Sequence, residues 1–243
     1  MNERKIPILM YHQIDQKPPK GAPMRGLVVS PRNFARQMQM LALLGYKGLS
    51  MNDLLPYLQG EKKGKVFGIT FDDGYENNLT FALPILKRHN FSSTCYIVAD
   101  RIGMTNDWDK VRNVKQVPLM TQTQLQQWID GGQEVGSHTL THPNLSKLSD
   151  AEQFVEIETS RKKLDSLIQQ RHGVPHFCYP FGALNDYSVY AVGIAGYITA
   201  TTTARARASI HDNKLLLPRV LISRTTSLLH LWAKVFTTYE DRK

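Results

Sequence analysis

Cysteine is scarce in this sequence: Cys95 and Cys178 are the only two in 243 residues. Two cysteines do not make the disulfide framework of a small secreted domain, and both lie in apolar, strand-like runs where buried free thiols are common. Apolar runs of transmembrane length are also lacking. Pro7 interrupts a first apolar stretch that is too short for a signal peptide. Taken as a complete chain, the sequence therefore predicts a cytoplasmic protein.

No linker-like shift in composition and no internal repeat divides the chain, and 42% apolar residues are enough for a substantial core. We expect a single domain over residues 1–243, with a core of about 8–222 and a C-terminal helix of about 226–239. The net charge of +9, from 30 basic and 21 acidic residues, suits an anionic partner. The basic residues are scattered, however, and no nucleic-acid motif is present. The charge therefore favours a solvated surface over nucleic-acid binding.

Strand-like and helix-like segments alternate along the chain. Helices between the strands begin at capping residues such as Ser30, Thr121 and Ser149. The helix after Ser149 is expected to run to about residue 170, and a helix over 78–88 is expected to kink at Pro84. This alternation indicates a parallel β/α architecture, and in barrels of this kind catalytic side chains collect at the carboxyl ends of the strands. The predicted strands are residues 8–11, 46–49, 66–71, 93–98, 134–137, 177–179, 197–201 and 215–222.

Two adjacent carboxylates, Asp72 and Asp73, follow the apolar strand 66–71 and precede Gly74. Neighbouring carboxylates repel each other, so a cation, a hydrogen-bond network or a shifted proton must offset the cost. One aspartate could hold a metal while the other handles protons. Asp-Asp-Gly is also ordinary turn chemistry, and on this motif alone the two interpretations are evenly balanced. The position at a strand end favours the functional one.

His138 and His142 follow the predicted strand 134–137 at a spacing of four residues. Two histidines so spaced can meet one metal ion, although the pattern alone is a modest signal. With a strand-end aspartate they make a two-histidine, one-carboxylate set, which suits Zn²⁺ or a similar divalent ion and leaves positions open for water and substrate. Metal-assisted hydrolysis requires such an open site.

Three motifs resemble the polysaccharide deacetylase family (carbohydrate esterase family four, the NodB-homology fold): Thr70-Phe71-Asp72-Asp73-Gly74, Ser137-His138-Thr139-Leu140-Thr141-His142 and Tyr179-Pro180-Phe181-Gly182. The resemblance covers roughly residues 8–222. It is nearest the branch that acts on poly-β-1,6-N-acetylglucosamine, because Tyr11-His12 follows the first strand. It implies a deformed (β/α) barrel and metal-dependent removal of N-acetyl groups from sugars, which gives acetate and a free amine.

The resemblance also implies roles for individual residues. Asp73, His138 and His142 would bind Zn²⁺, or another divalent metal such as Co²⁺ or Ni²⁺. Asp72 would be the catalytic base, and the backbone N–H of Phe181 would help to hold the oxyanion.

The sequence departs from the family pattern in two places. The third motif usually begins with an arginine that hydrogen-bonds the catalytic aspartate, and Cys178 stands there instead. The later motifs are not evident, and His211, in a polar stretch, fits the general acid poorly. The branch that acts on poly-β-1,6-N-acetylglucosamine places its general-acid histidine near the N-terminus, and Tyr11-His12 matches that arrangement. The resemblance therefore implies His12 as the acid, and we hypothesise that Arg219 takes the role of the missing arginine.

The substrate is less constrained than the chemistry. Without an export signal, a small or lipid-linked N-acetyl sugar at the inner membrane face is expected, with peripheral contact to anionic lipid through the apolar stripe of the last helix. More often such a stripe packs on the barrel. Segment 100–120, which holds Trp108, is a substrate lid or a surface excursion. The alternatives are a catalytically impaired glycan-binding pseudo-enzyme, a deacylase of another N-acyl sugar, and a phosphoesterase, for which no second ligand cluster is seen.

Overall fold

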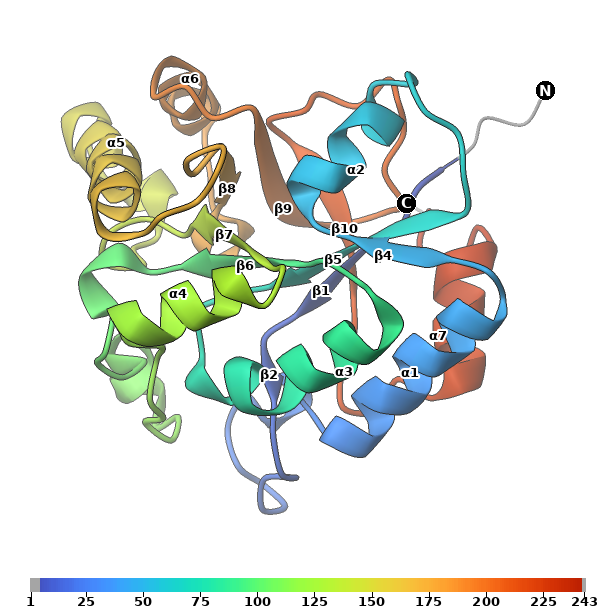
Figure 1. Ribbon diagram of the computed structural model, residues 1–243. Coiled ribbons are helices and arrows are strands. Elements are labelled where there is room, and N and C mark those ends of the chain that lie inside the picture. The colour runs from blue at the N-terminus through green and yellow to red at the C-terminus, as the bar shows by residue number, and fades with distance from the viewer. Residues whose placement is uncertain (1–4, 242–243) are drawn as a thin grey trace.

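The computed structural model describes residues 5–241 and contains a closed barrel of parallel strands with helices on its outside (Figure 1). β1 closes the barrel because it pairs with both β5 and β10. β4 (Lys47–Leu49) lies beside the ring and pairs with the first half of β5. The predicted (β/α) barrel is confirmed. In the described residues the ring consists of β1 (Ile8–Tyr11), β5 (Val66–Phe71), β6 (Thr94–Ile97), β7 (Glu134–Ser137), β8 (His176–Cys178), β9 (Thr199–Arg205) and β10 (Leu217–Leu221).

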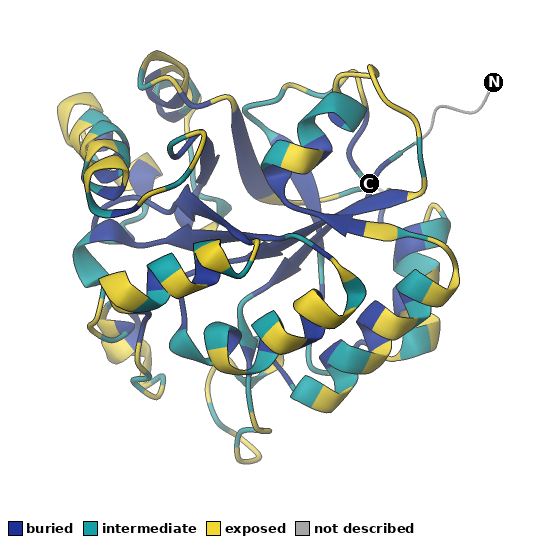
Figure 2. Ribbon diagram, viewed as in Figure 1, coloured by how far each residue is buried: buried dark blue, intermediate teal, exposed yellow. Residues whose placement is uncertain are grey.

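The outer helices bury one face against the barrel and expose the other (Figure 2). In α1, Phe34, Met38 and Leu41 recur at helical spacing and are fully buried. The predicted N-cap of Ser30 is present, since its hydroxyl accepts from the Asn33 N–H. The helices are α1 (Pro31–Leu43), α2 (Met51–Leu58), α3 (Leu83–His89), α4 (Gln122–Asp130), α5 (Asp150–Leu167), α6 (Asp186–Ile194) and α7 (Leu228–Phe236).

Two helices are shorter than the sequence suggested. α5 ends at Leu167 rather than near residue 170, because Ile168 turns to an extended conformation and buries its side chain. α7 covers Leu228–Phe236 rather than 226–239. Thr237 is extended at its C-cap, and ion pairs hold the following residues on a separate path.

The segment expected to form one helix kinked at Pro84 begins instead with a π-helical turn, Asn78–Ala82, and continues as α3. The Asn78 side chain is buried, accepts from the Ile14 N–H and donates to the His12 carbonyl oxygen. These two hydrogen bonds join the segment after β1 to the π-helical turn. The same segment contains β2 (Gln13–Ile14), which pairs with β3 (Val28–Val29). π-helical turns often occur beside functional sites, and this one fixes the backbone of His12.

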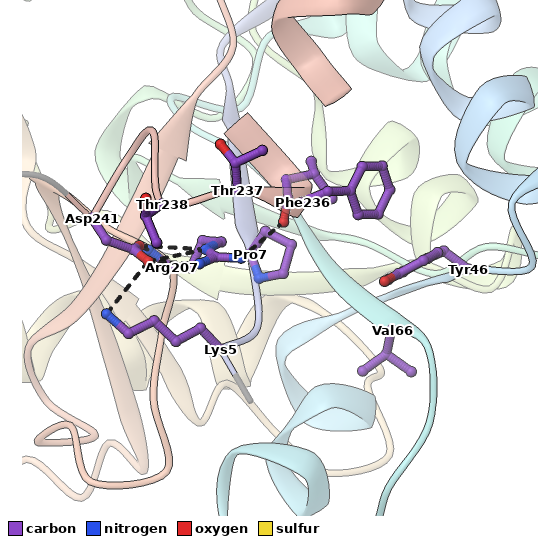
Figure 3. Close-up of a pocket in the computed structure, with 10 residues that line it drawn as sticks. Lys5, Pro7, Tyr46, Val66, Arg207, Phe236, Thr237, Thr238 and Asp241 are labelled. Carbon is purple, nitrogen blue, oxygen red and sulfur yellow. Dashed lines mark hydrogen bonds and ion pairs between the residues drawn. The ribbon is translucent and has the colours of Figure 1, made fainter. Parts of the chain in front are cut away.

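The C-terminal segment, residues 237–241, lies at the end of the barrel where β1 and β5 begin. The Arg207 guanidinium donates to Asp241, and Lys5 Nζ lies 3.5 Å from the same carboxylate (Figure 3). Together with Tyr46 and Phe236 these side chains line a cavity of about 680 Å³. This cavity is at the opposite end of the strands from the predicted catalytic residues.

The last helix divides its apolar residues between the barrel and the surface. Leu231 and Val235 are buried, whereas Leu229 is 76% exposed and Trp232 is 47% exposed. Within residues 5–241, no helix combines the length and hydrophobicity needed to cross a bilayer.

Candidate active site

All six residues singled out from the sequence line one pocket of about 370 Å³ at the carboxyl ends of the strands. The parallel barrel explains this, because every strand delivers its following residue to the same end. The six are His12 after β1, Asp72 and Asp73 after β5, His138 and His142 after β7, and Phe181 after β8.

Asp73, His138 and His142 form a compact cluster of possible metal ligands. Asp73 Oδ1 lies 3.5 Å from His138 Nε2 and 3.3 Å from His142 Nε2, and one ligand atom of each residue lies within 4.8 Å of the others. Ligands about 2.1 Å from a tetrahedral ion are about 3.4 Å apart. The cluster therefore fits a divalent cation in both spacing and donor type.

Backbone and side-chain contacts aim these ligands. His138 Nδ1 lies 2.7 Å from the Cys178 carbonyl oxygen, which directs Nε2 towards Asp73. Such a contact at the outer nitrogen is typical of metal-binding histidines. The Glu156 carboxylate accepts from the backbone N–H groups of Leu140 and Thr141 and so anchors the turn between the two histidines. Glu156 comes from α5, and no sequence signal linked it to this turn.

Left-handed backbone conformations concentrate in this cluster. Asp73, His142 and Phe181 have φ values of 75°, 65° and 59°, and Thr139 has 67°. Non-glycine residues seldom adopt such angles, which cost about 1–3 kcal/mol each unless the surroundings enforce them. Gly74, at φ 81°, carries the same turn onward after Asp73. The chain holds strain where the ligands converge.

Asp72 is buried in a different environment from that of Asp73. Arg219 Nη1 donates to Oδ1 at 2.6 Å, and Nη2 donates to Oδ2 at 2.8 Å. Burial raises the pKa of the Asp72 carboxyl, but the Arg219 charge and hydrogen bonds outweigh it, so the pKa lies below its usual value. The carboxylate is therefore ionised at neutral pH.

Arg219 reaches Asp72 from β10 through the barrel interior. Its Nε donates to the Thr202 carbonyl oxygen, and its Nη2 lies 3.2 Å from the Cys178 sulfur. The side chain is fully buried. The hypothesis that Arg219 contacts the carboxylate in place of an arginine at position 178 agrees with this geometry, since the small Cys178 side chain accommodates the guanidinium.

His12 faces the same carboxylate from the other side of the pocket. Its Nε2 lies 3.9 Å from Asp72 Oδ2, and its Nδ1 is buried with no hydrogen-bond partner in residues 5–241. His211 is not among the residues that line the pocket.

Segment 100–120 contributes one wall of the pocket. Trp108 stacks on the His142 ring at a centroid distance of 4.6 Å, and Phe181 meets the same ring edge-on at 4.5 Å. Arg112 lies over the Phe181 ring. Asp109 also lines the pocket and is almost fully buried. No sequence motif pointed to this residue. The segment therefore contacts the candidate metal ligands directly.

Metal uptake is expected to release a proton from His138. Burial lowers the pKa of the His138 imidazole, but the Cys178 sulfur and the hydrogen bond to Asp73 outweigh it, so the pKa lies well above its usual value. Burial keeps the pKa of His142 low. Because a ligand imidazole must be neutral, metal affinity should fall about tenfold per pH unit below the His138 pKa. Calorimetry in buffers of different ionisation enthalpy measures the number of protons released on metal binding. A metal affinity that does not change between pH 5 and 7 would contradict the assignment of His138 as a ligand.

Comparisons with known proteins agree with this geometry. A model of the polysaccharide deacetylase family matches residues 59–200. YxkH of Bacillus subtilis is 30% identical over 221 residues, which cover 90% of this chain and 72% of YxkH. The poly-β-1,6-N-acetyl-D-glucosamine N-deacetylase of Staphylococcus epidermidis is 24% identical, with 88% of this chain and 78% of that protein covered.

Among solved structures, the Streptococcus pyogenes deacetylase PplD, in complex with acetate, superposes with a TM-score of 0.83 at 27% identity. The match covers 96% of this chain and 99% of PplD. Sequence, fold and the gathered motif residues therefore agree that this chain belongs to the polysaccharide deacetylase family.

Proposed function

We propose that this protein is a metal-dependent hydrolase that removes the acetyl group from an N-acetylated amino sugar and gives acetate and a free amine. The family supplies the reaction class. One observation carries the assignment of roles: two adjacent carboxylates have opposite surroundings. Asp73 faces two imidazoles, whereas Asp72 is held by a guanidinium and faces His12. Such a division is typical of a pair in which one member binds metal and the other moves protons.

The chemistry follows from these positions. A divalent cation held by Asp73, His138 and His142 would polarise the amide carbonyl and lower the pKa of a water molecule. Zn²⁺ suits this donor set, with Co²⁺ and Ni²⁺ as alternatives. Asp72, ionised and fixed by Arg219, would accept the proton of the attacking water.

The two remaining roles concern the oxyanion and the leaving group. The backbone N–H of Phe181 would donate to the oxyanion, a contact that is often among the largest contributions to catalysis. His12 would protonate the departing sugar amine. Its position 3.9 Å from Asp72 supports this role, because the acid and the base must reach the leaving nitrogen and the attacking oxygen, which bond to the same carbonyl carbon.

For the substrate, we propose N-acetylglucosamine within a glycan or linked to a lipid carrier. The S. epidermidis relative is named for a glycan substrate. The basic charge and the exposed Leu229 and Trp232 support the lipid-linked version, in which α7 contacts an anionic membrane at its inner face. Binding to anionic vesicles that is absent with neutral vesicles would support this contact.

The test is amine release by metal-stripped protein and by protein restored with Zn²⁺, Co²⁺ or Ni²⁺. The panel contains β-1,6 and β-1,4 N-acetylglucosamine oligomers and a lipid-phosphate-linked N-acetylhexosamine. We expect turnover only after metal is restored. No turnover on the panel with metal fully bound would overturn the proposal in favour of a glycan-binding pseudo-enzyme or a deacylase of another N-acyl sugar.

His12→Ala should keep the metal and lower kcat by about 10²–10⁴-fold, because general acid catalysis contributes that much. Metal content by elemental analysis and kcat by amine release separate the two effects. His172→Ala removes an exposed histidine and serves as the control. Wild-type kcat in His12→Ala would exclude His12 as the acid.

A further inference from the structure

The formally charged side chains that line the active-site pocket differ sharply in exposure. The carboxylates Asp72, Asp73 and Asp109 belong to residues that are 3%, 6% and 6% exposed. The fourth charged residue of the lining is Arg205, at the end of β9, and its side chain is 60% exposed. The solvent-exposed charge of the pocket lining is therefore cationic.

Arg205 is held in place by a buried carboxylate. Its Nε donates to Glu240 Oε2 at 2.9 Å, and the Glu240 side chain has no exposed surface. Lys234 of α7 pairs with the other carboxylate oxygen. The Tyr239 side chain also contacts this guanidinium. The outer edge of a guanidinium anchored through Nε matches the two oxygens of a phosphate or carboxylate.

A neighbouring pair shows that anchoring the C-terminal segment does not depend on Arg205 alone. Arg207 binds Asp241 through its backbone N–H, Nε and Nη2, and its Nη1 donates to the Val235 carbonyl oxygen. However, Arg207 lines the cavity at the other end of the barrel (Figure 3). The two arginines thus pair with consecutive acidic residues, Arg207 through more contacts than Arg205, and Arg205 is the one that lines the active-site pocket.

Two further arginines belong to segments beside this pocket, although their side chains do not line it. Arg25 lies between Met24 and Leu27, which line the pocket, and the backbone N–H of Arg224 donates to the Gly26 carbonyl oxygen. The Nε atoms of Arg25 and Arg224 are buried without a hydrogen-bond partner in residues 5–241.

We propose that Arg205 binds an anionic group of the substrate, a phosphate or carboxylate next to the N-acetyl sugar, so that the enzyme prefers anionic over neutral sugars. This inference rests on the proposed deacetylase function and names the substrate class for it. A phosphate could belong to the glycan itself or to a lipid carrier, and the two sources share the chemistry that Arg205 recognises.

The experiment compares kcat/KM for a neutral β-1,6 N-acetylglucosamine disaccharide with that for the same disaccharide bearing a phosphate or a carboxylate. A short-chain lipid-phosphate-linked sugar forms a third arm and separates a carrier phosphate from a glycan phosphate. The selectivity, anionic over neutral, should exceed one and fall with added salt. It should fall about tenfold in Arg205→Gln, mainly through KM, because a charge-assisted hydrogen bond is lost.

Arg207→Gln is the control, since it removes the same charge and a more extensive ion pair with the C-terminal segment. Its selectivity should equal that of the wild type. Arg205→Lys should recover part of the selectivity, because it keeps the charge but not the planar fork. A loss that arose only from loosening residues 237–241 would appear in Arg207→Gln at least as strongly as in Arg205→Gln and would overturn the inference.

Failure of this inference is distinguishable from failure of the proposed function. Equal turnover of neutral and anionic sugars would refute the role of Arg205 while the deacetylase activity stands. If no sugar is turned over, calorimetric binding of the phosphorylated and neutral disaccharides to the same three variants decides. Tighter binding of the phosphorylated sugar, weakened only in the Arg205 variants, supports the inference, and equal binding overturns it.

Discussion

Asp73→Ala should lose both bound metal and turnover. Asp73 supplies the carboxylate of the ligand cluster and lies within 3.5 Å of both imidazoles. Removal of residues that merely support metal ligands costs 10- to 100-fold in affinity, so removal of a ligand should cost more than about 100-fold. Turnover at sub-stoichiometric metal should then fall below about one thousandth of the wild-type value.

Elemental analysis after dialysis, with kcat measured over a range of Zn²⁺ concentrations, tests this prediction. Asp130→Ala removes an exposed carboxylate at the end of α4 and is the control. Asp73 has a φ of 75°, which Ala tolerates less well than Asp, so urea unfolding of Asp73→Ala checks that the variant remains folded. Stoichiometric metal with normal turnover in Asp73→Ala would disprove the ligand assignment.

Asp72→Asn should keep the metal but lower kcat by about 10²–10⁴-fold, because an amide cannot accept the proton from water. It should also destabilise the fold by about 3–5 kcal/mol, because Arg219 is fully buried and loses its counter-charge. Arg219→Ala tests the other partner: it leaves Asp72 buried without its cation. Urea unfolding and metal content are measured beside kcat.

The double variant Asp72→Asn/Arg219→Met separates stability from catalysis. Replacement of both members of a buried ion pair by groups without charge is often neutral for stability, so unfolding should return towards the wild type while kcat stays low. Recovery of kcat in the double variant would show that Asp72 is not the base. Full activity in Arg219→Ala would show that the guanidinium has no positioning role.

The direction in which the Asp72 pKa is shifted determines how the stability contributed by the Asp72–Arg219 pair depends on pH. The pKa of Asp72 is lower in the folded protein than in the unfolded chain. Its stabilising contribution is therefore complete above the unfolded pKa and is lost as the pH falls through the folded value.

Several features of this protein were predictable from local sequence. Apolar runs with β-favouring residues located the strands. Thr121 caps the start of α4 as predicted, in a capping box with Gln124. These signals are local, because a cap or a strand needs only residues a few positions apart. Asp72, Asp73, His138 and His142 stood out for the same reason: each pair is contiguous or closely spaced in the chain. Their roles in the reaction remain predictions.

The contacts that give those residues different environments come from distant parts of the chain. Arg219 reaches Asp72 over 147 positions, and the Cys178 carbonyl aims His138 over 40 positions. Arg205 and Glu240 belong to no recognisable motif. From the sequence, segment 100–120, which holds Trp108 and Asp109, was either a substrate lid or a surface excursion. The sequence by itself determined which strands exist and which side chains follow them. Closure of the barrel decided which of those side chains meet, since pairing of β1 with both β5 and β10 brings all strand ends to one pocket.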